Sequence, residues 1–149
     1  MRRLALVMVA LWLTTPVLAA PAPPSPPAPP PAPMINWFEI PVTDLARARR
    51  FYEAVFGITL TPERVDGYDM AMFPADRQPS GALVKGDVYV PAKAGPILYF
   101  HTDDIDATMA RALAAGGRAL YARKDIGANG FVAEFEDSEG NRIALSQPR

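Results

Sequence analysis

Two ionisable side chains, Glu39 and His101, are candidates for acid/base chemistry. His101 is the only histidine of the chain, and Glu39 lies within the apolar segment WFEI. A buried carboxylate costs several kcal/mol unless it is paired. We therefore expect Glu39 to have a partner, which is Arg142 or another arginine, His101, a backbone donor or a ligand. His101 lies near the end of a predicted strand, next to Thr102 and Asp103, so a rim residue or a hydrogen-bond donor at the start of a helix is the alternative to a catalytic residue.

Three further side chains are candidates for binding a small molecule: Trp37, Tyr99 and Arg142. Residues two apart on a strand share a face, which groups Trp37 with Glu39 and Tyr99 with His101. An apolar cavity with a few converging polar groups is the usual composition of a small-molecule site. Trp37 is then a wall of the cup or a core residue, and a specific stacking platform is the alternative interpretation.

A repeat determines the elements that position these residues. Residues 36–57 match residues 96–117 at an offset of 60, with Trp37 over Ile97 and Asp44 over Asp104. Each copy predicts a strand, a tight turn and a helix. The two Asp residues are expected N-caps, and Gly57 and Gly116-Gly117 are expected C-terminal stops. The predicted buried helix positions are Leu45, Ala48, Tyr52 and Val55 in the first copy and Ile105, Met109 and Leu113 in the second.

The remaining segments complete the same order in both halves, which is strand, helix, strand, strand, strand. The expected strands are 58–61, 68–73, 81–90, 97–102, 118–121, 131–136 and 142–146, and the second helix is expected at about 105–115. Residues 124–130, KDIGANG, contain two glycines and are either a hairpin connection or a lid over a ligand.

The first 33 residues differ in composition from the rest. Residues 1–19 have a positive start, an apolar run and small residues near Ala19, which predicts a cleaved signal peptide and a periplasmic or secreted protein. An uncleaved membrane anchor is the alternative, but the run is shorter than the roughly 20 apolar residues that a bilayer span needs. Residues 20–33 are proline-rich and predict an extended tether, with a ligand for a groove-binding module as the alternative.

Composition excludes several classes of chemistry. The chain has no cysteine, which removes disulfides, thiolate catalysis and cysteine-ligated metal sites. Its net charge is −1, and loss of Arg2 and Arg3 with the predicted signal peptide makes it −3. We therefore expect no nucleic-acid partner.

The segments FEIPVTDLARARRFYEAVFG and FEDSEGNRIAL, together with the repeated unit, resemble the vicinal oxygen chelate superfamily. This superfamily includes glyoxalase I, the bleomycin- and fosfomycin-resistance proteins and the extradiol dioxygenases. GALVKGDVYVP and KDIGANGFVAEFEDSEGNRIAL are similar to its branch related to lactoylglutathione lyase. The resemblance implies an α+β fold over 34–149, in which two βαβββ modules (about 34–92 and 95–149) pair edge to edge in a curled mixed sheet that forms a cup.

The resemblance also implies where a divalent metal would bind, and those positions carry unsuitable residues. They are Trp37, Ile97, Ala144 and the stretch 81–84, which contains no histidine or carboxylate. A catalytic first-row metal needs at least three protein ligands. We expect no metal and no other cofactor, although an all-oxygen site that uses Glu39 and acidic loop residues stays open.

Three functions follow, in order of preference. The first is binding of a small organic molecule in the cup without a metal. The second is an enzyme related to glyoxalase, a lyase or isomerase, that uses Glu39 and His101 as a metal-free acid/base pair or has a non-standard metal site. The third is a non-catalytic interaction domain on a proline stalk. The resemblance implies a homodimer, and no membrane span is expected after signal removal.

Overall fold

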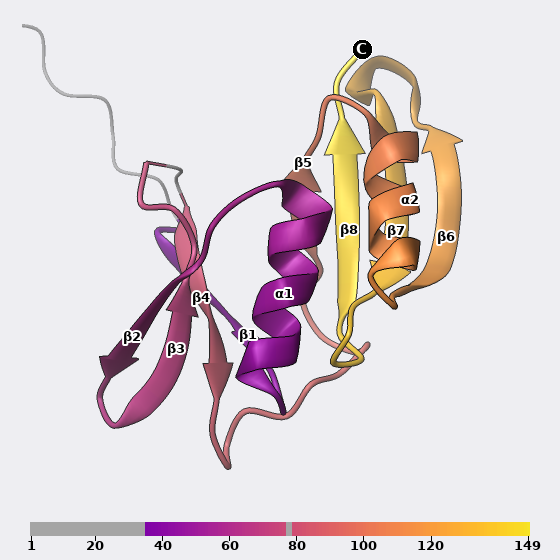
Figure 1. The fold of residues 1–149 in the computed structure, drawn as a ribbon. Coiled ribbons are helices and arrows are strands. Elements are labelled where there is room, and N and C mark those ends of the chain that lie inside the picture. The colour runs from indigo at the N-terminus through magenta and orange to yellow at the C-terminus, as the bar shows by residue number, and fades with distance from the viewer. Residues whose placement is uncertain (1–34, 77–78) are drawn as a thin grey trace, which may run out of the picture. The chain divides into compact units, whose positions relative to one another are not determined.

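Two βαβββ modules follow one another along the chain and are seen side by side in Figure 1. The computed structural model describes residues 35–76 and 79–149, so the predicted signal peptide and proline-rich tether lie outside the described residues. The first module comprises β1 (Trp37–Pro41), α1 (Leu45–Phe56), β2 (Thr61–Val65), β3 (Tyr68–Met72) and β4 (Ser80–Lys85). The second comprises β5 (Leu98–His101), α2 (Ile105–Ala114), β6 (Arg118–Asp125), the short 3-10 helix η1 (Gly127–Asn129), β7 (Phe131–Glu136) and β8 (Arg142–Gln147).

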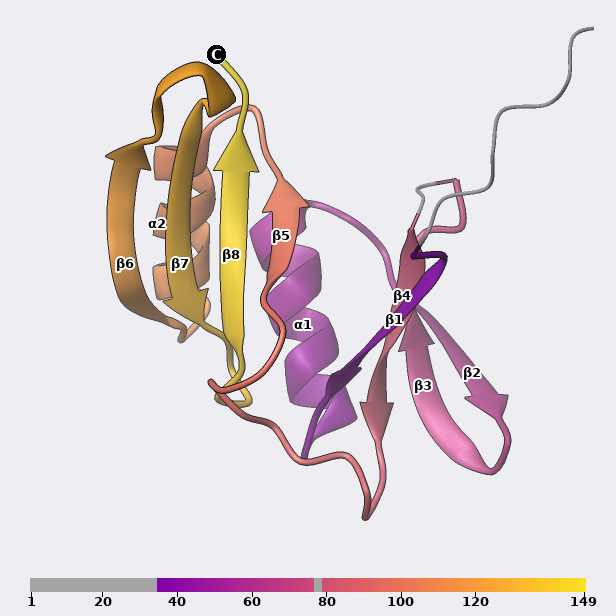
Figure 2. The same cartoon turned by 180° about the vertical axis from the view of Figure 1, so that it is seen from behind.

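Each module forms its own four-stranded mixed sheet with the same strand order. The orders are β1-β4-β3-β2 and β5-β8-β7-β6, and in both sheets the first pair is parallel and the others are antiparallel. The predicted repeat and the α+β fold class are therefore confirmed. The edge-to-edge pairing of the modules is not formed by backbone hydrogen bonds in the described part of the chain, where β1 and β5 are each the end strand of their sheet. Figure 2, which views the molecule from behind, shows these two strands facing each other.

The helix boundaries agree with the expected caps. The carboxylate of Asp44 accepts a hydrogen bond from the backbone N–H of Arg47, and that of Asp104 accepts one from Ala107. Gly57 ends α1 in the left-handed conformation, with φ of 63°. In α2 the buried side chains are Ile105, Thr108 and Ala112, so the prediction that Leu113 is buried is wrong; it is 47% exposed.

Several strand boundaries differ from the sequence prediction. Residues 58–60 precede β2, which continues to Val65 because a tight turn at Asp66 and Gly67, both with positive φ, joins it to β3. β4 ends at Lys85, and residues 86–90 leave the sheet. β6 extends to Asp125 through two irregularities in register. The predicted lid at 124–130 is a connection between β6 and β7 and contributes no side chain to the two pockets described below.

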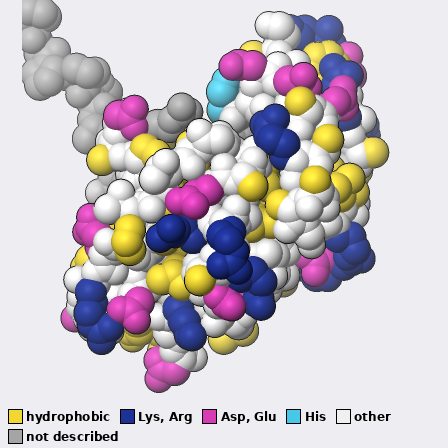
Figure 3. Space-filling view, in the orientation of Figure 1, with side chains coloured by type: hydrophobic (Ala, Val, Ile, Leu, Met, Phe, Trp, Pro, Cys, Tyr) yellow, Lys and Arg dark blue, Asp and Glu magenta, His cyan; other side chains and the backbone are white. Residues whose placement is uncertain are grey.

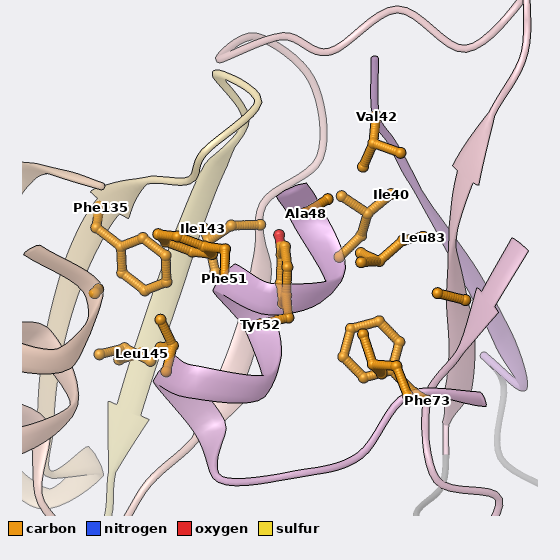
Figure 4. Packing of buried hydrophobic residues seen from close by; sticks show 14 of the residues in the cluster. Ile40, Val42, Ala48, Phe51, Tyr52, Phe73, Leu83, Phe135, Ile143 and Leu145 are labelled. Atoms are coloured by element: carbon orange, nitrogen blue, oxygen red, sulfur yellow. The ribbon is translucent and has the colours of Figure 1, made fainter. Parts of the chain in front are cut away.

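Helix α1 lies between the two sheets and joins their cores. Figure 4 shows Phe51 directed toward Phe135 and Ile143 of the second module, while Ile40 and Leu83 of the first module lie on the other side of the helix. All these side chains are at most 2% exposed. One continuous hydrophobic cluster therefore contains residues of both modules.

Polar contacts, some of them buried, also connect the modules, at a site that we call the module junction: Thr43, Arg47, Tyr52, Asp137, Glu139 and Asn141. The hydroxyl of Tyr52 donates to Asp137 at 2.8 Å, and Nδ2 of Asn141 donates to the carbonyl oxygen of Pro41 at 2.9 Å. Glu139 accepts from the backbone N–H groups of Thr43 and Asp44, at 3.0 and 3.1 Å. The turn between β7 and β8 is thus fixed to the start of α1.

Charge is mixed over the surface. Figure 3 shows Lys and Arg side chains interspersed with Asp and Glu on the face that it presents. Within the described residues, no helix has the length and hydropathy that crossing a membrane requires.

Candidate functional site

Glu39 has two partners, and both are aromatic side chains. The hydroxyl of Tyr89 donates to Oε2 of Glu39 at 2.6 Å, and the indole N–H of Trp37 donates to Oε1 at 3.1 Å. The hydrogen bond to Glu39, with a smaller effect of burial, raises the pKa of Tyr89 to about 12. The expectation of a partner for Glu39 is met, but the expected arginine or His101 is not that partner, because the segment after β4 turns Tyr89 back over β1.

His101 and Arg142 form contacts of their own. Nε2 of His101 lies 3.2 Å from Oδ1 of Asp103, and both side chains are exposed. The guanidinium of Arg142 donates to Oε2 of Glu134 through Nε at 2.7 Å, and its Nη2 lies 2.7 Å from the same oxygen. Glu39 and His101 therefore do not form the predicted hydrogen-bonded acid/base pair, and His101 makes the rim contact that the alternative interpretation expected.

The residues at the positions implied for a metal do not fit one. The side chains of Trp37, Ile97 and Ala144 have no ligand atom for a divalent ion. The stretch 81–84 is Gly-Ala-Leu-Val, which also offers no side-chain ligand. No group of three His, Cys, Asp or Glu side chains suited to hold an ion occurs among residues 35–76 and 79–149. The carboxylate of Glu39 is engaged by two neutral donors instead. The donor set is therefore not that of a first-row metal centre.

A pocket of about 440 Å³ lies where the end strands of the two sheets face each other. Side chains of both modules line it: Phe38, Phe56, Ile58, Phe73, Pro74, Pro79, Ser80, Leu98, Tyr99, Phe100 and His101. Five of these residues carry phenyl or phenol rings, and the polar groups come from Ser80, Tyr99 and His101. We call this the aromatic pocket. Its volume is within the range of small-molecule sites.

A second pocket of about 370 Å³ adjoins the first and shares Phe38 and Leu98 with it. It contains Glu39 and Arg142, together with the linker residues Val90 and Ala92. The predicted site residues are thus divided between two adjacent pockets, with Tyr99 and His101 in one and Glu39 and Arg142 in the other. Trp37 lines neither and contacts Glu39 from the adjacent position on the same face of β1.

Sequence reasoning missed Tyr89 and the phenylalanines of the aromatic pocket. The sequence carries no signal for Tyr89, because Val88, Tyr89 and Val90 are all apolar or aromatic and the segment that contains them lies beyond the end of β4. Gly81 is also required locally, since a Cβ atom there would overlap the carbonyl oxygen and the ring of Phe38. A glycine in β4 thus lets the ring of Phe38 pack across the strand.

Fold and site together define a two-module α+β protein with an aromatic pocket between its modules and no metal-ligand cluster in the described residues. The chain belongs to the Glyoxalase/Bleomycin resistance protein/Dioxygenase superfamily, whose pattern matches residues 34–145.

Three related proteins illustrate the range of this superfamily. TnmS3 of Streptomyces sp. CB03234, an antibiotic binding protein, is 27% identical, with a TM-score of 0.59 over 79% of this chain and 98% of its own. The anthracycline biosynthesis protein DnrV of Streptomyces peucetius is 30% identical over 125 residues, which are 73% of this chain and 45% of DnrV. CFP32 of Mycobacterium bovis is 28% identical over 118 residues, which are 75% of this chain, and this chain spans 44% of CFP32.

Proposed function

We propose that this protein binds a small organic molecule in the aromatic pocket and needs no metal to do so. The observation that carries this proposal is the composition of the pocket, in which five aromatic rings from two modules surround the hydroxyl groups of Ser80 and Tyr99 and the ring of His101. Apolar walls provide affinity, and a few polar groups orient the ligand. The similarity to an antibiotic binding protein over nearly its whole length supports this class of ligand.

Titration calorimetry of the full chain against a panel of antibiotics and metabolites, with and without a chelator, tests the proposal. We expect at least one ligand to bind with an affinity that the chelator does not change. Tyr99→Ala should weaken this binding, because Tyr99 lines the pocket and is 54% exposed. Tyr121→Ala is the matched control, since Tyr121 is 41% exposed on β6 and does not line the pocket. A panel without any binder, or binding that the chelator abolishes, contradicts the proposal.

The metal-free acid/base alternative has less support, because Glu39 and His101 hydrogen-bond to different partners. It stays a prediction with a direct test. Lyase and isomerase assays on the wild type and on Glu39→Gln should give a loss of turnover in the variant if Glu39 is catalytic. Equal rates would remove Glu39 from any mechanism.

We also propose that the protein is exported and that it forms a homodimer. Export is supported by the composition of residues 1–19, and intact mass of protein from the cell envelope should show a chain that starts at Ala20. A retained Met1 would contradict export.

A dimer is supported by Val88 and Val90, which are 70% and 71% exposed beside Tyr89. Sedimentation should give twice the chain mass, and a monomer would contradict the dimer.

A further inference from the structure

We propose that the ligand of the aromatic pocket is a flat, uncharged, conjugated ring system that carries carbonyl or hydroxyl oxygens on its edge. This inference rests on the proposed function and specifies the chemical class of its ligand. Three features of the pocket carry it: the arrangement of its rings, its free hydroxyl groups and the lack of carboxylates, lysines and arginines among its described lining residues.

The rings form a connected set around Phe100. Its centroid lies 4.7 Å from that of Phe56, 5.8 Å from that of Phe73 and 6.0 Å from that of Phe38. These separations are those of favourable aromatic pairs, and the angles between ring planes range from 31° to 90°, so the rings are tilted or edge-to-face. Phe38, Phe56 and Phe100 are only partly buried and line the pocket, which leaves part of each ring open to a ligand. A flat conjugated molecule can make the same tilted and edge-to-face contacts through its own π system, which a puckered saturated skeleton lacks.

The polar groups of the pocket are available to a neutral ligand. Ser80 is 8% exposed, and within the described part of the chain neither its hydroxyl nor that of Tyr99 has a hydrogen-bond partner. Both residues line the pocket, where a carbonyl or hydroxyl oxygen of a ligand would satisfy them. His101 uses Nε2 for its contact with Asp103, so its second ring nitrogen is available at the rim.

Charge separates this pocket from its neighbour. Among residues 35–76 and 79–149, no Asp, Glu, Lys or Arg lines the aromatic pocket, whereas the second pocket contains Glu39 and Arg142. Burying a ligand charge without a partner is costly. The aromatic pocket therefore favours an uncharged ring system, and any charged substituent of the ligand would extend toward the second pocket past Phe38 and Leu98.

A matched ligand pair tests the proposal on the full chain: a hydroxylated anthraquinone and its perhydro derivative, which has the same skeleton and oxygen atoms without the aromatic rings. We expect calorimetry to show about tenfold tighter binding of the anthraquinone. Phe100→Leu should reduce this preference by about two- to tenfold, the range of aromatic pair contributions. Phe131→Leu is the control, because Phe131 lies under Arg123 and Arg149 and does not line the pocket. Ser80→Ala should weaken binding of the anthraquinone and should change the melting temperature of the protein little.

The outcomes separate this inference from the proposed function. Equal affinities of the two ligands, or a preference that Phe100→Leu leaves intact, would overturn the aromatic class. If saturated or charged members of the antibiotic panel bind while the anthraquinone does not, the proposed function stands and the ligand class is wrong. If no panel member binds, the proposed function is wrong. A melting curve of each variant identifies a folding defect, and Tyr99→Leu is a second ring deletion at an exposed position where folding should not change.

Discussion

The side chain of Glu139 in the second module receives two hydrogen bonds from Arg47 in the first, one from Nε and one from Nη2, each 2.8 Å long. Glu139 has a fully buried side chain, while that of Arg47 is about half exposed. The same carboxylate also accepts from the hydroxyl of Thr43 at 2.7 Å. One carboxylate thus fixes the turn between β7 and β8 to the start of α1, and with it the geometry of the two modules on either side of the aromatic pocket.

Replacing this carboxylate should destabilise the protein. Glu139→Gln keeps the shape of the side chain but removes its charge, and charge-assisted hydrogen bonds contribute more than neutral ones, so we expect a loss of about 2–3 kcal/mol in the free energy of unfolding. Urea denaturation measures this value. Glu63→Gln, a change at an exposed carboxylate of β2, is the control and should have little effect. An unchanged midpoint for Glu139→Gln would show that the junction does not stabilise the fold.

Acid should weaken the same contact. Burial alone would raise the pKa of Glu139, but the hydrogen bonds from Arg47, Thr43 and Asp44 outweigh burial and hold the pKa at about 2, below the ordinary value of 4.5. The stabilisation is therefore complete above about pH 4.5 and is lost as the pH falls toward about 2. Urea midpoints measured across this window should fall more steeply for the wild type than for Glu139→Gln. Parallel pH profiles of the two proteins would contradict this assignment.

Tyr89 should report directly on Glu39. Because the carboxylate of Glu39 accepts from the hydroxyl, and burial acts in the same direction, the pKa of Tyr89 is raised to about 12. In Glu39→Gln this pKa should fall toward about 10, the ordinary value for tyrosine. Ultraviolet titration of tyrosinate measures the shift. The titration of Tyr89→Phe gives the signal of the other tyrosines, which is subtracted to leave that of Tyr89. A Tyr89 that titrates identically in wild type and variant would show that the contact is absent in solution.

The buried hydroxyl of Tyr52 gives a fourth prediction. It donates to Asp137 at 2.8 Å, and burial together with this carboxylate raises the pKa of Tyr52 well above its ordinary value. Tyr52→Phe should reduce the free energy of unfolding by about 1 kcal/mol, the typical net value of one hydrogen bond. Tyr68→Phe is a matched control, because no partner of the Tyr68 hydroxyl occurs in the described residues. Equal effects of the two changes would show that the hydrogen bond from Tyr52 to Asp137 adds no net stability.

Local chemistry explains which features the sequence predicted correctly. The repeat, the caps at Asp44 and Asp104 and the glycine stop at Gly57 depend on residues within a few positions of one another, and the structure has all of them. The residue types at the positions implied for a metal are likewise read directly from the sequence. Leu113 shows the limit of helical periodicity. The polar residue Thr108 lies on the buried face of α2, where its hydroxyl donates to the carbonyl oxygen of Asp104, while the apolar Leu113 is exposed.

The sequence by itself determined two βαβββ modules, no thiol chemistry and no usual set of metal ligands. Only the tertiary structure decided that Glu39 pairs with Tyr89, 50 residues away, and that Phe38, Phe73 and Phe100 surround one pocket. The pocket arises because α1 packs between two sheets and holds their end strands opposite each other, and the Glu39 contact arises because the segment after β4 returns Tyr89 to β1. Side-chain periodicity predicts which residues share a face, but the packing of distant elements determines which faces meet.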